Sequence, residues 1–363
     1  MSTVYLRHIS GMKGMGALIV LFHHFFYCFY PLFLAEGQTH SFVEQIPVVN
    51  LFLNGNFAVC LFLMLSGYLV SLQCSTYHSL SDYSEAIPKR YLRLALPLLV
   101  PTLFAFLLYS FGLFRIHEVS TELMNGMTVD YYQDIKPHHL LASLVLAPFG
   151  YSILNGPYWM LDAILLGSYL VMLVHLVCGK LPMGKRILFL LFMLSITYYY
   201  HPYYACPLAG VLLREIEIKM TPLKNGWRHV LSLIFFVISI ALCCLQEGVF
   251  QFNIHLNALS ASCFILSVLV SPLLRALFSL RVMDAAGRIS MGIYVFHWPV
   301  ICSFSCWLFL QGWMSVSTVT MSVLFLLSAG LIVMLAWAYH RWVEPFAAES
   351  GRKILHLFFS EQQ

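Results

Sequence analysis

The chain has 363 residues, of which 60% are hydrophobic and 10% are charged, and its mean hydropathy is +0.80. This balance excludes a water-soluble globular domain and indicates a polytopic membrane protein. The formal net charge of +4 reflects basic loops on one side of the membrane and gives no reason to predict nucleic-acid binding. The 10 cysteines are scattered without zinc-site spacing, so no metal is predicted.

Apolar windows long enough to span a bilayer recur along the whole chain. They fall at 14–35, 51–72, 92–114, 157–178, 184–200, 201–214, 229–247, 256–276, 288–310 and 316–339. The predicted fold is all-α, a single membrane-embedded domain over residues 1–363 with about ten transmembrane helices. The first window is too long for a signal-peptide core and lacks a small-residue cleavage site, so we expect an uncleaved signal-anchor helix.

The basic residues predict the orientation of these helices. If the amino terminus is cytoplasmic, all but two of the 20 Lys and Arg residues lie on the inner side. The two on the outer side are Arg115 and Lys136. Such an asymmetry predicts that both termini are cytoplasmic. The expected location is a cell membrane, as a multi-pass protein, and a bacterial inner membrane in particular.

Few titratable side chains lie inside the windows, where they are energetically costly and therefore point to function. These residues are His23, His24, Asp162, His175 and His297. A histidine kept from water tends to be neutral and can accept a proton from a hydroxyl, so His24 is a candidate general base. His297 is expected at the depth of His24, which predicts a shared central site. Alternatively, each histidine only hydrogen-bonds across helices, an interpretation that we favour for His175.

The first apolar helix is expected to open at Lys13-Gly14, with His24 eleven residues further on. That separation is almost three helical turns, so both side chains share one stripe roughly 16 Å apart along the axis. The stripe is expected to carry a cation at the membrane surface and a base near mid-bilayer. His23 points about 100° away from His24 and cannot line the same contact.

Arg90 and Arg93 stand one turn apart at the predicted cytoplasmic start of the third helix. Arginine binds phosphate bidentately, so a nucleotide-bearing donor such as a coenzyme A thioester is a natural ligand for this pair. The alternative is that both arginines anchor the helix at lipid phosphates.

Several separated segments together resemble the integral membrane acyltransferase-3 family, and the resemblance covers most of the chain. The similar segments are Lys13 to His24, Leu61 to Leu69, Arg90 to Arg93 with Pro97, Asn155 to Leu161, Gly287 to Pro299 and Trp342 to Pro345. The family typically O-acylates sugars of surface polysaccharides and related compounds. Small Ser66 and Gly67 in the second segment are expected to let helices approach closely.

The resemblance implies roles for individual residues. His24 holds the spacing of the family's proposed catalytic histidine, and Arg90 and Arg93 would contact the acyl donor. Lys13, where the family usually has arginine, belongs to the same donor-binding group. The substrate-site candidates are His23, Trp159, Asp162, Tyr294 and His297.

The chain departs from the family pattern at Ile164, where the family commonly has a glutamate five residues after the motif tryptophan. Asp162 is the nearest carboxylate. A shift of two residues turns a side chain by about 200° on a helix, so Asp162 would face nearly the opposite way unless the helix is unwound there.

The predicted function is membrane-bound O-acyl transfer, most simply of an acetyl group, from cytoplasmic acyl-coenzyme A to a hydroxyl of a cell-surface carbohydrate or lipid-linked glycan. Direct proton abstraction by His24 and an acyl relay through it both fit the sequence. The alternatives are a transporter or flippase that uses its intramembrane histidines as a proton relay, and an inactive scaffold with the same fold. The patterns indicate no oligomeric state.

Overall fold

The computed structural model describes residues 6–29, 53–123, 135–245, 253–312 and 318–359. These residues form helices and connections with no strand among them, which confirms the predicted all-α class. The long helices are α1 (Arg7–Cys28), α3 (Gly55–Cys74), α4 (Leu80–Ser110), α7 (Leu161–Cys178), α8 (Met183–Tyr200), α9 (Pro202–Met220), α10 (Asn225–Cys244), α11 (Ile254–Val270), α14 (Ser290–Val300), α16 (Thr318–Ala338) and α17 (Glu344–Phe359).

Shorter helices and turns connect the long ones. The short α-helices are α5 (Ile116–Leu123), α6 (Pro137–Leu146), α12 (Pro272–Phe278), α13 (Arg281–Arg288) and α15 (Cys306–Leu310). The 3₁₀ turns are Ala147–Phe149 and Gly156–Met160, and the π-helical segments are Ile301–Ser305 and Tyr339–Val343. The π segments join α14 to α15 and α16 to α17 without a break.

Each predicted window overlaps a long helix. In the described part of the chain, seven helices are long and apolar enough to cross a membrane, or eight if α11 and α12 form one bent span. The hairpin of α8 and α9 is not in this set, because both helices carry charged residues: Lys185 and Arg186 in the first turn of α8, and Arg214, Glu215 and Glu217 in α9. A membrane protein with several spans is therefore shown, while the count of ten and the side of the termini stay predictions.

The first helix begins earlier than its hydropathy predicts. Because α1 starts at Arg7, Lys13 lies inside it rather than at its opening, and His24 lies one turn before its end at Cys28. The polar first turns are helical because they pack on α13, where Ser10 Oγ donates to the carbonyl of Asp284 at 3.4 Å. Residues 30–35 of the predicted window lie outside the described residues.

The predicted span 256–276 is broken. The axes of α11 and α12 meet at 102°, with Ser271 extended at the junction and its Oγ accepting the N–H of Leu274 at 3.3 Å. Pro272 has no N–H to continue the helical ladder, so the chain restarts with proline in the first turn. The single-helix prediction was wrong because it read hydropathy alone across a Ser-Pro helix start.

Glycines let the core helices touch backbone to backbone, as predicted for Ser66-Gly67. A Cβ built on Gly67 would lie 1.9 Å from the carbonyl oxygen of Pro207 in α9, and one on Gly210 would lie 2.0 Å from the carbonyl oxygen of Met64. Small residues at such crossings are typical of membrane helix packing. α3 and α9 are thereby fixed at close distance.

Replacing Gly67 by alanine should destabilise the protein by about 1–3 kcal/mol, because the added methyl overlaps a backbone oxygen that cannot move alone. Thermal unfolding in detergent measures the effect. Gly330→Ala in α16 is the matched control, since nothing lies within 4 Å of its Cβ position, and it should be neutral or stabilising by about 0.4–1 kcal/mol. Equal unfolding temperatures for the two variants would contradict the close approach of α3 and α9.

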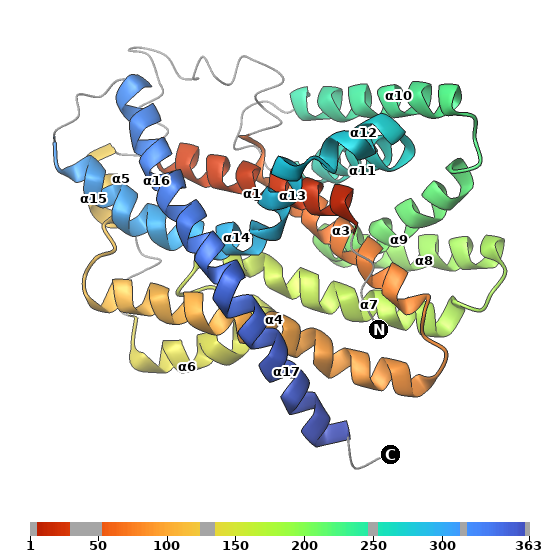
Figure 1. Cartoon of the computed structure of the whole chain (residues 1–363), viewed down its shortest axis with the longest axis horizontal. Coiled ribbons are helices and arrows are strands. Elements are labelled where there is room, and N and C mark those ends of the chain that lie inside the picture. The colour runs from red at the N-terminus through yellow and green to blue at the C-terminus, as the bar shows by residue number, and fades with distance from the viewer. Residues whose placement is uncertain (1–5, 30–52, 124–134, 246–252, 313–317, 360–363) are drawn as a thin grey trace.

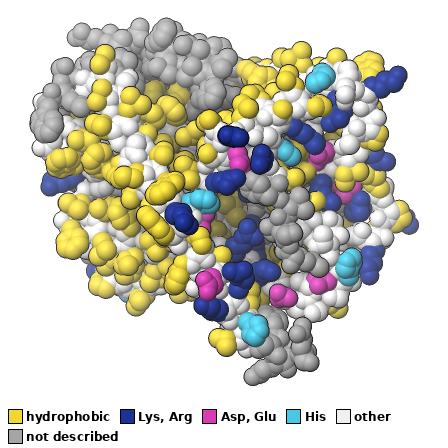
Figure 2. All heavy atoms as spheres, viewed as in Figure 1, with side chains coloured by type: hydrophobic (Ala, Val, Ile, Leu, Met, Phe, Trp, Pro, Cys, Tyr) yellow, Lys and Arg dark blue, Asp and Glu magenta, His cyan; other side chains and the backbone are white. Residues whose placement is uncertain are grey.

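α1 lies among α3, α12, α13 and α14, so the helix that carries Lys13 and His24 is held on several sides (Figure 1). α4 packs against α6, α7 and α17 at the lower side of the same view. Basic side chains are concentrated in the middle and right of the face in Figure 2, whereas its left part is mostly hydrophobic.

Candidate functional site

His24 and His297 lie side by side between α1 and α14. His297 Nε2 is 3.2 Å from His24 Nδ1, and the ring centroids are 4.8 Å apart. His297 is fully buried, whereas His24 is partly accessible. The structure thus brings together two residues that are 273 positions apart in the chain.

The hydrogen bonds of His24 and His297 indicate which nitrogen of each ring carries the proton. His24 Nδ1 lies 2.9 Å from the carbonyl oxygen of Val20, and His297 Nδ1 lies 3.2 Å from that of Ile293. Since a carbonyl only accepts, both Nδ1 atoms carry the hydrogen in these bonds. His297 Nε2 is then an acceptor facing the Nδ1–H of His24. The remaining atom, His24 Nε2, keeps a lone pair and forms no hydrogen bond with a described residue.

The tryptophan motif holds α14 in place beside His24. Asn155 Nδ2 donates to the carbonyl of Val295 at 2.8 Å, and the Tyr294 hydroxyl donates to the carbonyl of Pro157. Trp298 packs edge-on against His24 with ring centroids 5.3 Å apart. It also lies against Gly156, where a Cβ would be 3.3 Å from its indole nitrogen. Tyr294 is therefore a support for α14 with its hydroxyl already occupied.

His23 points away from His24 toward the start of α3. Its Nδ1 donates to the carbonyl of Leu53 at 2.7 Å, and its ring lies so close to Gly55 that a Cβ there would be 2.5 Å away. The two rings are nearly perpendicular, with an interplanar angle of 86°. His23 ties the end of α1 to the beginning of α3.

The three donor-binding candidates lie near the other end of α1, with Lys13 on that helix and Arg90 and Arg93 on α4. The charges of Arg90 and Arg93 both act on Lys13, which is partly buried in α1. Arg90 donates through Nε to Ser168 Oγ at 3.0 Å and through Nη2 to Ser66 Oγ at 2.7 Å. Among the described residues, none of the three cations forms an ion pair with a carboxylate. Like charges held together without a counterion form a site for an anion.

Asp162 and Trp159 face α9 rather than the histidine pair. Asp162 Oδ2 accepts the hydroxyl of Tyr204 at 2.6 Å, and its Oδ1 accepts the next backbone N–H at 2.5 Å. Trp159 packs on Tyr203 with ring centroids 5.1 Å apart. The preceding residues form a 3₁₀ turn, but the unwinding does not turn the carboxylate to His24.

The structure also adds residues that the sequence did not single out. Ser66 and Ser168 orient Arg90, and Trp298 and Asn155 shape the surroundings of His24. Ser66, Asn155 and Trp298 stood inside motifs that carried a signal, and Ser168 did not. His175 binds Ser71 Oγ at 2.9 Å, in agreement with a structural role in helix contact.

The histidine pair lies toward one end of α1 and the cation cluster toward the other, and the helices around them are those of a polytopic membrane protein. The sequence model of the acyltransferase domain matches residues 6–341, nearly the whole chain. The chain belongs to this acyltransferase-3 family and is a membrane acyltransferase. Comparison with curated proteins and with solved structures found no match.

Proposed function

We propose that the protein is a membrane-bound O-acyltransferase that moves an acyl group, acetyl in the simplest case, from acyl-coenzyme A to a hydroxyl of a cell-surface glycan or lipid-linked glycan in a bacterial inner membrane. The observation that carries the proposal is the His24–His297 contact, which leaves His24 Nε2 as a proton acceptor. Family membership favours transfer over the transporter alternative.

In the direct route, His24 Nε2 takes the proton of the acceptor hydroxyl while that oxygen attacks the thioester carbonyl. The C–S bond breaks and coenzyme A leaves as a thiolate, which then takes up the proton that His24 Nε2 received, so that the imidazole is neutral again. The imidazolium formed on His24 keeps its Nδ1–H on the Val20 carbonyl and His297 Nε2. In the relay route, His24 Nε2 attacks the thioester carbonyl, the C–S bond breaks and coenzyme A leaves as a thiolate. The acceptor oxygen then attacks the acyl carbon, the bond from that carbon to Nε2 breaks, and the proton of the acceptor hydroxyl passes to the thiolate.

The cation cluster suits the donor because a coenzyme A thioester carries its phosphates and its reactive carbonyl at opposite ends of an extended arm. Lys13 and His24 are eleven residues apart on α1, or roughly 16 Å along the helix axis. We infer that the phosphates bind Lys13, Arg90 and Arg93 while the thioester extends toward His24. The serine hydroxyls on Arg90 hold its guanidinium for this contact.

Arg90→Ala and Arg93→Ala should each weaken binding of coenzyme A by about 10- to 100-fold, the loss of a charge-assisted hydrogen bond of roughly 1.5–3 kcal/mol. Calorimetric titration of coenzyme A into the purified protein in nanodiscs measures this. Lys89→Ala is the matched control, because Lys89 is adjacent, exposed and 4.0 Å from Glu85. If all three variants bind alike, the arginines are membrane anchors.

A further inference from the structure

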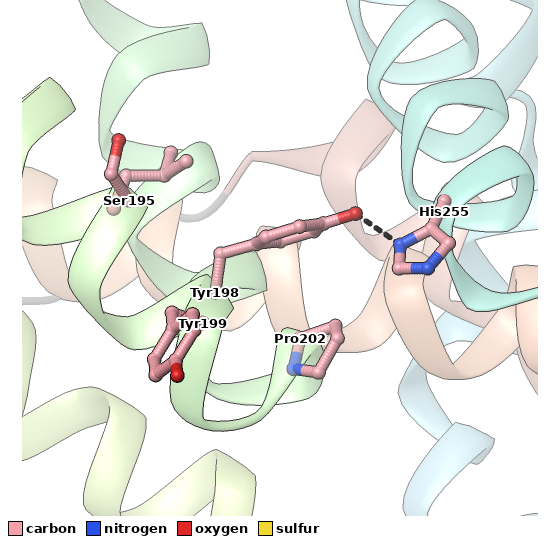
Figure 3. Close-up of a pocket in the computed structure, with 6 residues that line it drawn as sticks. Ser195, Tyr198, Tyr199, Pro202 and His255 are labelled. Carbon is pink, nitrogen blue, oxygen red and sulfur yellow. Dashed lines mark hydrogen bonds between the residues drawn. The ribbon is translucent and has the colours of Figure 1, made fainter.

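An open groove of about 650 Å³ lies where α8 ends and where α9 and α11 begin (Figure 3). Its lining residues are Leu194, Ser195, Tyr198, Tyr199, Pro202 and His255. The volume falls within the ~300–1,000 Å³ typical of small-molecule sites. None of these residues belongs to the histidine pair or to the cation cluster, so the groove is a separate feature.

The lining combines aromatic faces with neutral hydrogen-bonding groups. The Tyr198 hydroxyl points at His255 Nδ1 and hydrogen-bonds to it across the groove, as Figure 3 shows. Tyr199 is 87% exposed and its ring meets that of Tyr200 edge-on, with centroids 6.0 Å apart, so the Tyr199 ring remains accessible to a ligand. The lining contains no Lys, Arg, Asp or Glu, and a phosphate headgroup would find no counter-charge here. The electron-rich face of a tyrosine ring attracts the C–H groups of a sugar, whose hydroxyls need partners such as Tyr and His.

The first turn of α9 connects the groove to the tryptophan motif. Pro202 lines the groove, and the next residue, Tyr203, packs on Trp159 with ring centroids 5.1 Å apart. The Tyr203 hydroxyl donates to Asn56 Oδ1 in α3 at 2.9 Å. The groove and the tryptophan motif therefore share a wall at one end of the bundle.

α11 connects the groove to the histidine end of α1. His255 lies two residues before Asn257, whose Oδ1 accepts from Asn54 Nδ2 at 2.7 Å. Asn54 follows Leu53, and the carbonyl of Leu53 accepts the Nδ1–H of His23. The groove therefore opens at the end of the bundle where α1 places His23 and His24, away from the cation cluster.

We propose that this groove binds a neutral sugar ring of the acceptor glycan, stacked on Tyr199 and hydrogen-bonded to Tyr198 and His255. The proposal rests on the proposed function, since it gives the acceptor a place to bind at the same end of the bundle as His24. The competing explanation is that these tyrosines only anchor the protein at the membrane interface. Tyr200 distinguishes the sugar site from membrane anchoring, because it is 82% exposed and adjacent to Tyr199 but does not line the groove.

Photocrosslinking in cells of the native host tests what occupies the groove. p-Benzoylphenylalanine is placed at position 199 in one strain and at position 200 in a second, both in the His24→Gln background so that bound acceptor is not turned over. After irradiation, mass spectrometry of the purified protein should show hexose-bearing adducts from position 199 and only lipid adducts from position 200. Lipid adducts alone, or no adduct, at position 199 overturn the sugar site.

Activity provides the second measurement. Tyr199→Ala should lower the acylated fraction of surface glycan about tenfold, equivalent to the loss of one good aromatic contact of ~1.4 kcal/mol, while Tyr200→Ala leaves it unchanged. Equal effects of the two variants overturn the proposal. If wild-type cells acylate their glycan but position 199 captures none, the groove assignment fails and the proposed function stands. If position 199 captures hexose but wild-type cells show no acylated glycan, the groove assignment stands and the proposed function fails.

Discussion

Replacing His24 by glutamine is expected to lower the rate of acyl transfer by about 10²- to 10⁴-fold, the usual contribution of a positioned general base. Glutamine keeps much of the volume and can still donate to the Val20 carbonyl, but its amide cannot take up a proton at neutral pH. Release of the coenzyme A thiol by purified protein, supplied with acetyl-coenzyme A and unacylated glycan extracted from the host, measures the rate. In the relay route the loss is larger, because the nucleophile itself is removed.

His175→Gln is the matched control for this substitution. His175 is also a partly buried histidine in a long helix, but it binds Ser71 and makes no contact with His24. Its activity should equal that of the unsubstituted protein, and both variants should bind coenzyme A normally. An active His24→Gln protein with intact donor binding would remove His24 from the chemistry.

Replacing His297 by alanine is expected to lower kcat by about 10- to 100-fold, the range found for hydrogen-bond partners that fix the tautomer and orientation of metal-bound imidazoles. His297 Nε2 accepts the Nδ1–H of His24, so the variant leaves the ring of His24 with one fewer partner to fix its tautomer. KM for acetyl-coenzyme A should not change, because the cation cluster lies at the other end of α1. The measurement is a steady-state titration of the donor at fixed acceptor.

His297→Gln distinguishes orientation from packing. His297 is fully buried, so the alanine variant leaves a cavity that lowers stability as well. Glutamine fills more of this space and its side-chain oxygen can accept from His24 Nδ1–H, so it should recover part of kcat. A rise in KM for the donor with unchanged kcat in either variant would place His297 outside the positioning role.

The helices were largely predictable because a bilayer demands long apolar runs, and each window from 14–35 onward overlaps a helix. The ends of the helices were less predictable. α1 starts at Arg7 because its polar first turns pack on α13 through glycines, and hydropathy does not report such contacts. The bend between α11 and α12 had a local signal in Ser271-Pro272, which hydropathy averaging over a window removed.

The candidate site was predictable where depth along the helices places two side chains together, and less so where the direction of a side chain depends on a distant partner. Matched depth along their helices predicted that His24 and His297 lie together, and the structure has them in contact. The direction of Asp162 depended on a partner, Tyr204, that lies 42 positions away and carries no motif. Likewise, nothing in the sequence near Arg90 indicates that Ser66 and Ser168 hold it.

The most direct test compares surface glycans from three host strains: one lacking the gene, one with the wild-type gene restored and one with His24→Gln restored. Mass spectrometry of the isolated glycans and lipid-linked glycans reads the acyl increments, with membrane levels of both proteins checked by immunoblot. We predict that the wild-type gene alone restores an acyl increment absent from the other two strains. Identical spectra from all three strains would contradict an acyltransferase that works through His24.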